Sequence, residues 1–189
     1  MKENIKSELE ETLKSINFDE YFLEATFQFK LLMALGKKYC EDNIYPERSI
    51  ERYRSVLNPK EKYAKKRIDI VFENKENENI AIELKMPKNG QYPEQMFKFV
   101  QDVKFLEQLK ATKIFSECFL ITVTKDKGFW EGNETDRIYS YFRNSKVLTG
   151  TIHKPTGQNN EAKYYEIKGK YEIKWENIKD GFRFFIIEI

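Results

Sequence analysis

Histidine and cysteine are scarce in this chain of 189 residues, which has one histidine, His153, and two cysteines, Cys40 and Cys118. A single histidine excludes a metal site built from several imidazoles and catalysis by a histidine pair, and we expect His153 to lie on a surface strand or loop. Two cysteines exclude a disulfide framework, make a thiolate zinc site a poor interpretation, and favour a reducing compartment.

Long apolar segments are also missing from the sequence. The first residues, MKENIKSELEETLKSI, are charged throughout and lack the apolar centre of a signal peptide, and no later run approaches the length of a membrane span. We therefore expect a cytoplasmic protein with no membrane partner. The net charge of +2 favours no class of partner, while 34% charged and 15% aromatic residues are typical of a soluble, folded chain.

The pattern of apolar residues predicts an α/β fold in which helices cover a mixed sheet. Helices are expected at 2–16, in a following apolar segment that Asn17 or Asp19 can cap, at 94–112 and at 133–144. An edge strand is expected within 43–53, a strand buried on both faces at 118–124, and further strands within 146–155, 163–175 and 182–189. A tight connection is expected at Lys168, Gly169 and Lys170.

The segment RIDIVFENKENENIAIELKMP, residues 67–87, carries charged residues inside two strand-like runs. The polar stretch NKENEN separates the runs, so the segment predicts a β-hairpin. Successive strand side chains point to opposite faces, so apolar side chains share one face of each strand: Ile68, Ile70 and Phe72, then Ile80, Ile82, Leu84 and Met86. When these apolar faces are matched, Asp69, Glu83 and Lys85 converge on the other face.

Two carboxylates beside a lysine suit the hydrolysis of a phosphodiester. A divalent cation polarises the phosphoryl oxygen and generates hydroxide, and a hard cation such as Mg²⁺ (or Mn²⁺) takes oxygen ligands, commonly one or two carboxylates and water. We expect Asp69 and Glu83 to supply these ligands, with the peptide carbonyl of Leu84 as a further one. Lys85 would orient the attacking water or stabilise charge on the phosphate.

At these residues the sequence resembles the PD-(D/E)xK nucleases, which include many restriction endonucleases and DNA-repair nucleases. Asp69 is followed by thirteen residues and then by Glu83-Leu84-Lys85, with an acidic helix before the hairpin and a helix and a buried strand after it. One departure is that Ile68 stands where the motif has its proline. The resemblance covers about residues 19–125 and implies a restriction-endonuclease-like αβββαβ core. A strand-rich extension at about 145–189 would complete a single domain of residues 1–189.

The resemblance further implies a Mg²⁺-dependent deoxyribonuclease in which Asp69, Glu83 and Lys85 are the site. We expect a restriction or defence endonuclease that acts on DNA, and its size suits a homodimer that cuts both strands. In this family a glutamate from the first core helix often completes the site, and the candidates here are Glu24, Glu20 and Glu47.

Other interpretations stay open at this point. Asp69, Glu83 and Lys85 could form a structural salt bridge. The chain could also be a nucleic-acid-binding module without turnover, or a structural subunit of a larger defence complex. An acidic residue two positions before a lysine is common in this chain, since it also occurs at Glu73, Asp102, Glu161, Glu166 and Glu172. The alternating strand around Glu83, the partner strand and the helix beyond favour the nuclease interpretation.

A basic block leads into the strand of Asp69. Between Arg48 and Arg67 the acidic residues are Glu51 and Glu61, against Arg48, Arg52, Arg54, Lys60, Lys62, Lys65, Lys66 and Arg67. The block could be a solvated loop or a rim that faces phosphate groups. In the second case we expect Lys65, Lys66 and Arg67 to contact nucleic acid. Strand alternation places Lys65 and Arg67 on the face of Asp69 and Lys66 on the opposite face.

The remaining polar and aromatic residues have simpler interpretations. We expect Gln95, Gln101 and Lys104 on a solvated helix face rather than at a phosphate. Phe129 and Trp130 are expected to cover the core rather than to stack on a base.

Overall fold

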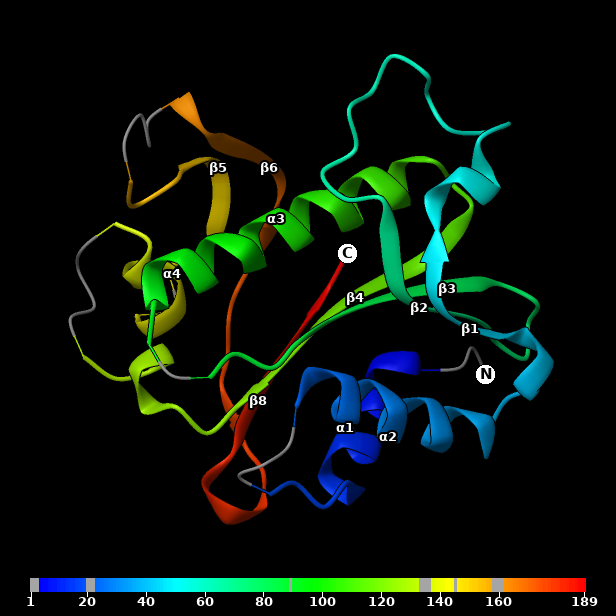
Figure 1. Cartoon of the computed structure of the whole chain (residues 1–189), viewed down its shortest axis with the longest axis horizontal. Coiled ribbons are helices and arrows are strands. Elements are labelled where there is room, and N and C mark those ends of the chain that lie inside the picture. The colour runs from blue at the N-terminus through cyan, green and yellow to red at the C-terminus, as the bar shows by residue number, and fades with distance from the viewer. Residues whose placement is uncertain (1–3, 20–22, 89, 133–136, 145, 158–161) are drawn as a thin grey trace.

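A computed structural model describes residues 4–19, 23–88, 90–132, 137–144, 146–157 and 162–189. A mixed sheet of six strands lies at its centre, in the order β1-β2-β3-β4-β8-β7, and helices cover both faces of this sheet (Figure 1). At this level the predicted α/β fold is confirmed. Among the described residues, no helix combines the length and the apolar character that a membrane crossing requires.

The strands of the central sheet are β1 (Ile44–Ser49), β2 (Arg67–Glu73), β3 (Asn79–Lys85), β4 (Phe115–Thr124), β7 (Glu176–Asn177) and β8 (Arg183–Glu188). β3 and β4 are parallel, and the other neighbouring pairs of this sheet are antiparallel. Helix α3 (Tyr92–Ala111) makes the crossover that a parallel pair needs. The predicted hairpin, the helix after it and the buried strand are therefore confirmed.

The edge strand predicted within 43–53 is β1, which, in the part of the chain that the structure describes, pairs with β2 alone. Pro46 lies inside β1, and Glu47 has a positive φ of 49°. Both features suit an edge, because proline cannot donate to a second ladder and a residue with positive φ interrupts the regular strand geometry.

Each face of the central sheet has its own apolar cluster. Helices α1 (Ile5–Ser15) and α2 (Glu24–Gly36) pack on one face, where Leu9 and Leu31 lie with Ile82. Helix α3 packs on the other face, where Phe99 lies with Val71. Burial of two apolar sheet faces explains why β4 is almost continuously apolar in sequence.

Two details of the apolar pattern differ from the prediction or test it. Ile68, near the start of β2, belongs to the cluster on the α3 side together with Ile50, whereas Ile70 belongs to the cluster on the other face, so the expectation that they share a face is wrong. Phe129 and Trp130 are buried in the same α3-side cluster, so their predicted role in the core is confirmed.

The sequence predicted which segments are helical better than it predicted the residues at which the helices begin and end. Helix α1 confirms the helix expected at 2–16, and its N-cap is Asn4, which accepts a hydrogen bond from the N–H of Ser7. The prediction that Asn17 or Asp19 caps the next helix is wrong, since α2 begins at Glu24 with Leu23 as its N-cap. The described part of the helix expected at 133–144 is α4 (Tyr139–Arg143), and 133–136 lie outside the described residues.

A second, two-stranded antiparallel sheet consists of β5 (Leu148–His153) and β6 (Tyr164–Tyr171) and packs on α3 (Figure 1). The tight connection predicted at Lys168, Gly169 and Lys170 is wrong, because β6 continues through Gly169. Glycine is needed there for a different reason: the Tyr171 side chain fills the space that a Cβ atom would take. The carboxylate of Glu107 on α3 accepts hydrogen bonds from the N–H groups of Lys168 and Gly169.

Candidate functional site

Three carboxylates and two ammonium groups meet on the sheet face that α3 covers. The carboxylates belong to Asp69 on β2, Glu83 on β3 and Asp102 on α3, and the ammonium groups to Lys65, just before β2, and Lys85, at the end of β3. We call these five residues the charged cluster. Glu83 and Asp102 are buried, whereas the side chains of Lys65, Asp69 and Lys85 are 23%, 18% and 15% exposed. The structure thus brings Asp69, Glu83 and Lys85 together.

Asp69 is fixed to the neighbouring strand by its own side chain. The ladder between β2 and β3 runs from Glu73↔Asn79 to Ile70↔Ile82. Beyond this ladder, the N–H of Leu84 donates to Asp69 Oδ2, with 2.7 Å between nitrogen and oxygen. The side-chain amide of Gln28 on α2 donates to the Asp69 carbonyl at 2.8 Å. The carboxylate therefore has a defined orientation, with Oδ1 3.7 Å from the Lys65 ammonium.

The two lysines connect the carboxylates. Lys65 Nζ donates a hydrogen bond to Glu83 Oε2 and lies 3.2 Å from Asp102 Oδ1, in addition to its contact with Asp69. Lys85 Nζ lies 3.1 Å from Asp102 Oδ2 and donates to the carbonyl of Leu84 at 2.8 Å. Asp102 therefore bridges the two ammonium groups, and Lys65 contacts all three carboxylates.

Negative charge is in excess in the cluster, and this shifts its pKa values. Burial, followed by the charges of Asp69 and Asp102, raises the pKa of Glu83 well above its ordinary value despite the two lysines. Burial also raises the pKa of Asp102, against the opposing effect of Lys85 and Lys65. Burial by itself lowers the pKa of Lys65, but the carboxylates of Glu83, Asp102 and Asp69 outweigh it, and the pKa rises. Lys65 thus stays charged, while the raised pKa values of Glu83 and Asp102 favour their protonated forms more than in a free carboxyl group.

Three buried polar atoms on this sheet face have no hydrogen-bond partner among the described residues: Glu83 Oε1, Thr122 Oγ1 and Asp102 Oδ2, the last of which lies in the ion pair with Lys85. Thr122 of β4 is in register with Lys85, so both side chains point to the same face. Leaving a buried polar atom unpaired costs on the order of 1–3 kcal/mol. Such atoms are therefore places where a bound ion or water would be stabilised.

The oxygen atoms that a hard cation prefers are present here, namely Asp69 Oδ1, Glu83 Oε1 and the Leu84 carbonyl. Within the described part of the chain, however, no group of three or more Asp, Glu, His and Cys side chains is arranged so that it could hold a metal ion. The Lys65 ammonium instead contacts all three carboxylates, and Lys85 donates to the Leu84 carbonyl. The carboxylates are arranged around an internal cation.

Two of the three glutamates considered from the sequence are described, and Glu20 lies outside the described residues. Glu24 Oε2 accepts a hydrogen bond from the N–H of Met86, next to Lys85, at 2.9 Å. Glu47 accepts one at 3.2 Å from Gln28, the residue that also donates to the Asp69 carbonyl. Glu24 is thus joined directly to the end of β3, and Glu47 is joined to β2 through Gln28.

The sequence analysis missed Asp102 as a member of the site. Asp102 follows Phe99 by three residues and precedes Leu106 by four, so all three side chains belong to one stripe of α3. Phe99 and Leu106 are buried in the α3-side cluster. The available signal was therefore a charged residue at a position where the helical period requires an apolar one, since a buried charge needs a partner.

The residues expected at nucleic acid divide into two groups. Lys66 and Arg67 are exposed, as a phosphate-facing rim would require. Lys65 instead directs its ammonium into the charged cluster. Gln101, expected on a solvated face, donates from its side chain to the carbonyl of Ala64 at 2.8 Å, so this expectation is wrong.

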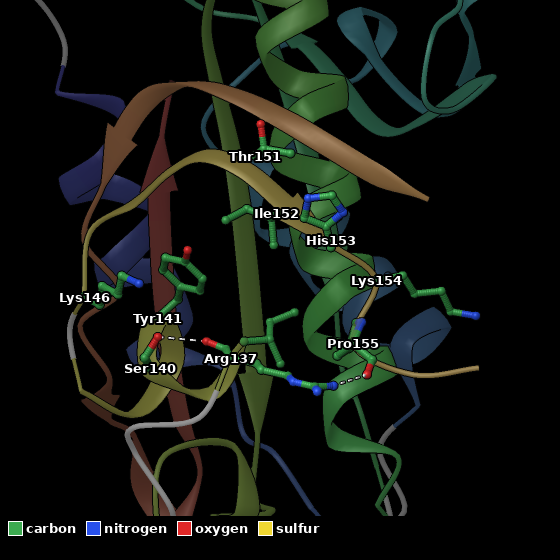
Figure 2. Close-up of a pocket in the computed structure, with 10 residues that line it drawn as sticks. Arg137, Ser140, Tyr141, Lys146, Thr151, Ile152, His153, Lys154 and Pro155 are labelled. Carbon is green, nitrogen blue, oxygen red and sulfur yellow. Dashed lines mark hydrogen bonds between the residues drawn. The ribbon is translucent and has the colours of Figure 1, made fainter. Parts of the chain in front are cut away.

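A separate cavity of about 460 Å³ lies between α4 and β5 (Figure 2). Its described lining includes Arg137, Lys146, His153 and Lys154, and it includes no acidic side chain and no residue of the charged cluster. The Arg137 guanidinium donates to the carbonyl of Pro155 at 3.3 Å. His153 is exposed at the end of β5, which confirms its predicted surface position.

Comparison with known proteins adds no assignment to this geometry. No family model matches the chain, and no curated protein and no solved structure matches it at a significant level. The interpretation of the charged cluster therefore depends on its own residues and contacts.

Proposed function

We propose that this chain is a metal-dependent nuclease of the PD-(D/E)xK type, which hydrolyses DNA phosphodiester bonds at the charged cluster. The observation that carries the proposal is Glu83, a fully buried carboxylate with one oxygen unpaired, beside a second carboxylate, Asp69, and two lysines. Removing so many charges from water is costly, and apolar residues of similar volume would stabilise the same face at least as well. Such a cluster is therefore better explained by function than by stability.

The order of elements supports the same proposal. Helix α2, strands β1, β2 and β3, helix α3 and strand β4 follow one another as αβββαβ. Asp69 lies on the second of these strands and Glu83-Leu84-Lys85 on the third. This is the arrangement that the sequence resemblance predicts for a restriction-endonuclease-like core.

The residues of the cluster can be given chemical roles. Asp69 and Glu83, with the Leu84 carbonyl, would hold Mg²⁺ or Mn²⁺, which when bound polarises the phosphoryl oxygen and lowers the pKa of a bound water. Lys85, held by Asp102, would donate to the phosphate or to the attacking water. Glu24 is the candidate for an additional acidic group because it is hydrogen-bonded beside Lys85. The same proposal includes a homodimer that cuts both strands, in a cytoplasmic restriction or defence role.

DNA cleavage should depend on a divalent cation. Supercoiled and linear DNA incubated with the protein and Mg²⁺ or Mn²⁺ should be cut, and an excess of EDTA should abolish cutting, because the carboxylates alone cannot activate water. Agarose gel electrophoresis measures both outcomes. Nicking that persists in EDTA would contradict this mechanism, and the lack of cleavage with either metal would favour a binding module or a structural subunit.

Lys66 and Arg67 should contribute to DNA binding through phosphate contacts. Each such contact releases counterions and adds about 0.9 to the slope of log K against log salt concentration. Replacing both residues by alanine should therefore flatten this slope by up to about two units. Binding is measured by fluorescence anisotropy at several salt concentrations, in Ca²⁺ and in a Lys85→Ala background to prevent turnover.

A matched control for this experiment is the double variant Lys168→Ala and Lys170→Ala. Both lysines are exposed on β6, so removing them changes the net charge equally. The slope should stay unchanged in this control. The opposite result, a flatter slope in the β6 variant alone, would place the DNA along the second sheet.

A further inference from the structure

Lys65 occupies the position between the carboxylates that a bound cation would take. Its ammonium is hydrogen-bonded to Glu83 Oε2 and lies 3.2 Å from Asp102 Oδ1 and 3.7 Å from Asp69 Oδ1. Two of these partners, Asp69 and Glu83, are the carboxylates assigned above to the metal. An ammonium and a divalent cation would therefore compete for the same two carboxylates.

The backbone before Lys65 is fixed on α3 by two glutamines. The N–H of Ala64 donates to Gln108 Oε1 at 2.8 Å, and the Ala64 carbonyl accepts from Gln101 Nε2 at 2.8 Å. Gln108 is buried and also donates to the carbonyl of Lys62 and to the carboxylate of Glu61. Both polar groups of the residue before Lys65 are thus satisfied by one helix, which also carries Asp102. A solvated loop would not need these hydrogen bonds, and they place Lys65 so that its side chain reaches the charged cluster.

We propose that Lys65 is the internal counter-ion of the metal site. Its ammonium group holds the carboxylates together in the metal-free protein and moves away from Glu83 and Asp69 when a divalent cation binds. The inference depends on the proposed function, since it needs Asp69 and Glu83 to be metal ligands. It gives a role to a residue that the nuclease motif does not include. It also implies that competition between the Lys65 ammonium and the divalent cation sets the metal affinity.

The exchange is physically simple because the backbone stays in place. Lysine has a flexible four-carbon stem, so its ammonium can move several ångströms while Ala64 remains bound to α3. A divalent cation neutralises the excess negative charge that now draws Lys65 inward. Asp102 continues to contact the Lys85 ammonium, so the second lysine stays beside the site. The released ammonium remains beside the site, where the proposed substrate carries negative phosphate groups.

The test compares metal binding by the full-length wild-type protein and by Lys65→Met, without nucleic acid. Methionine has a similar length and no charge, so Lys65→Met removes the competing cation. We expect Mn²⁺ to bind about tenfold more tightly to Lys65→Met in isothermal titration calorimetry. The reason is that the substitution removes one positive charge that lies within about 4 Å of the carboxylates of a partly buried site. We also expect the melting temperature of the metal-free variant to fall, since the carboxylates then repel one another, and its rise on addition of Mn²⁺ to exceed that of the wild type.

Two further variants make the result decisive. Lys60→Met removes the same charge from an exposed position in the same loop and should leave the Mn²⁺ affinity unchanged. Lys65→Arg keeps the charge and should not bind Mn²⁺ more tightly than the wild type. If Lys65→Met does not fold, Gln101→Met replaces it; this variant releases the Ala64 carbonyl and should tighten Mn²⁺ binding by a smaller factor.

The possible failures can be told apart. Equal or weaker Mn²⁺ binding by Lys65→Met, beside a wild type that binds Mn²⁺, would overturn the role of Lys65 and leave the proposed nuclease intact. If neither the wild type nor any of these variants binds Mn²⁺, the metal site is overturned and both proposals with it.

Discussion

Replacing Glu83 by glutamine should reduce the rate of DNA cleavage by about a thousandfold or more, while the protein stays folded. Glutamine has the shape of glutamate but no charge to hold a divalent cation. Asp69→Asn should have an effect of the same order, because it removes the charge of the second proposed metal ligand. Single-turnover cleavage of a labelled DNA in Mg²⁺ measures the rate, and circular dichroism verifies the fold.

The chain contains its own control for this experiment. Glu166-Ile167-Lys168 repeats the acidic-x-lysine pattern on strand β6, but Glu166 and Lys168 are exposed. Glu166→Gln should therefore keep the wild-type rate. A Glu83→Gln protein that cleaves as fast as Glu166→Gln would refute the assignment of the site.

The stability of Glu83→Gln distinguishes a catalytic site from a structural salt bridge. Because the pKa of Glu83 is raised in the folded protein, the folded state binds a proton that the unfolded chain releases above about pH 4.5. Glu83 therefore costs stability as the pH rises from this value towards its raised pKa. Glu83→Gln should gain stability relative to the wild type between pH 5 and pH 8, as measured by urea unfolding. A purely structural ion pair predicts the opposite: lower stability and no change in rate.

Replacing Phe99 by alanine should lower the free energy of unfolding by about 3–5 kcal/mol, the cost of a large cavity in a packed core. Phe99 is 1% exposed, and its ring lies near those of Phe129, Phe142 and Phe185, with centroids 5.8, 5.5 and 6.1 Å away. The side chain thus joins α3 to three other parts of the α3-side cluster. Urea denaturation followed by tryptophan fluorescence measures the change.

Phe29→Ala is the matched control for Phe99→Ala. Phe29 lies on α2 with 58% of its surface exposed, so its removal should change the free energy of unfolding by about 0.5 kcal/mol or less. Equal effects of the two substitutions would show that α3 does not cover the sheet as described. Because α3 carries Asp102, Gln101 and Gln108, its packing is also a condition for the geometry of the site.

The hairpin and its three charged residues could be predicted because the information is local. Alternation of apolar residues fixes which side chains of a strand share a face, and a short turn fixes the partner strand. Asp69, Glu83 and Lys85 therefore follow from one segment of sequence. The same logic predicted the mixed sheet and most of its strands, since each depends on the pattern within a few residues.

Asp102 and the orientation of Lys65 could not be predicted in this way. Their contacts join elements that are distant in sequence, and only the packing of α3 on the sheet brings them together. Strand alternation predicts that Lys65 shares the face of Asp69, but a run of basic residues usually faces water, so nothing local shows that the Lys65 ammonium enters a buried cluster. The wrong connection at Gly169 has a related cause, because the Tyr171 side chain of the same strand fills the space beside this glycine. The wrong cap of α2 lacked a local signal, since Leu23 makes no side-chain hydrogen bond to the helix.

Strand β1 limits how two copies of this chain could associate. Its proline, Pro46, cannot donate a hydrogen bond to a further strand, and the positive φ of Glu47 interrupts the regular strand geometry of this edge. On the opposite side, β7 pairs with Arg183 and Phe184 of β8, so Phe185–Glu188 of β8 also form that edge among the described residues. The β1 edge is thus the one that offers no regular backbone on which a second sheet could continue. Two copies that met at β1 would therefore contact each other through side chains, so their separation and angle could evolve without any change in the strands that carry the charged cluster.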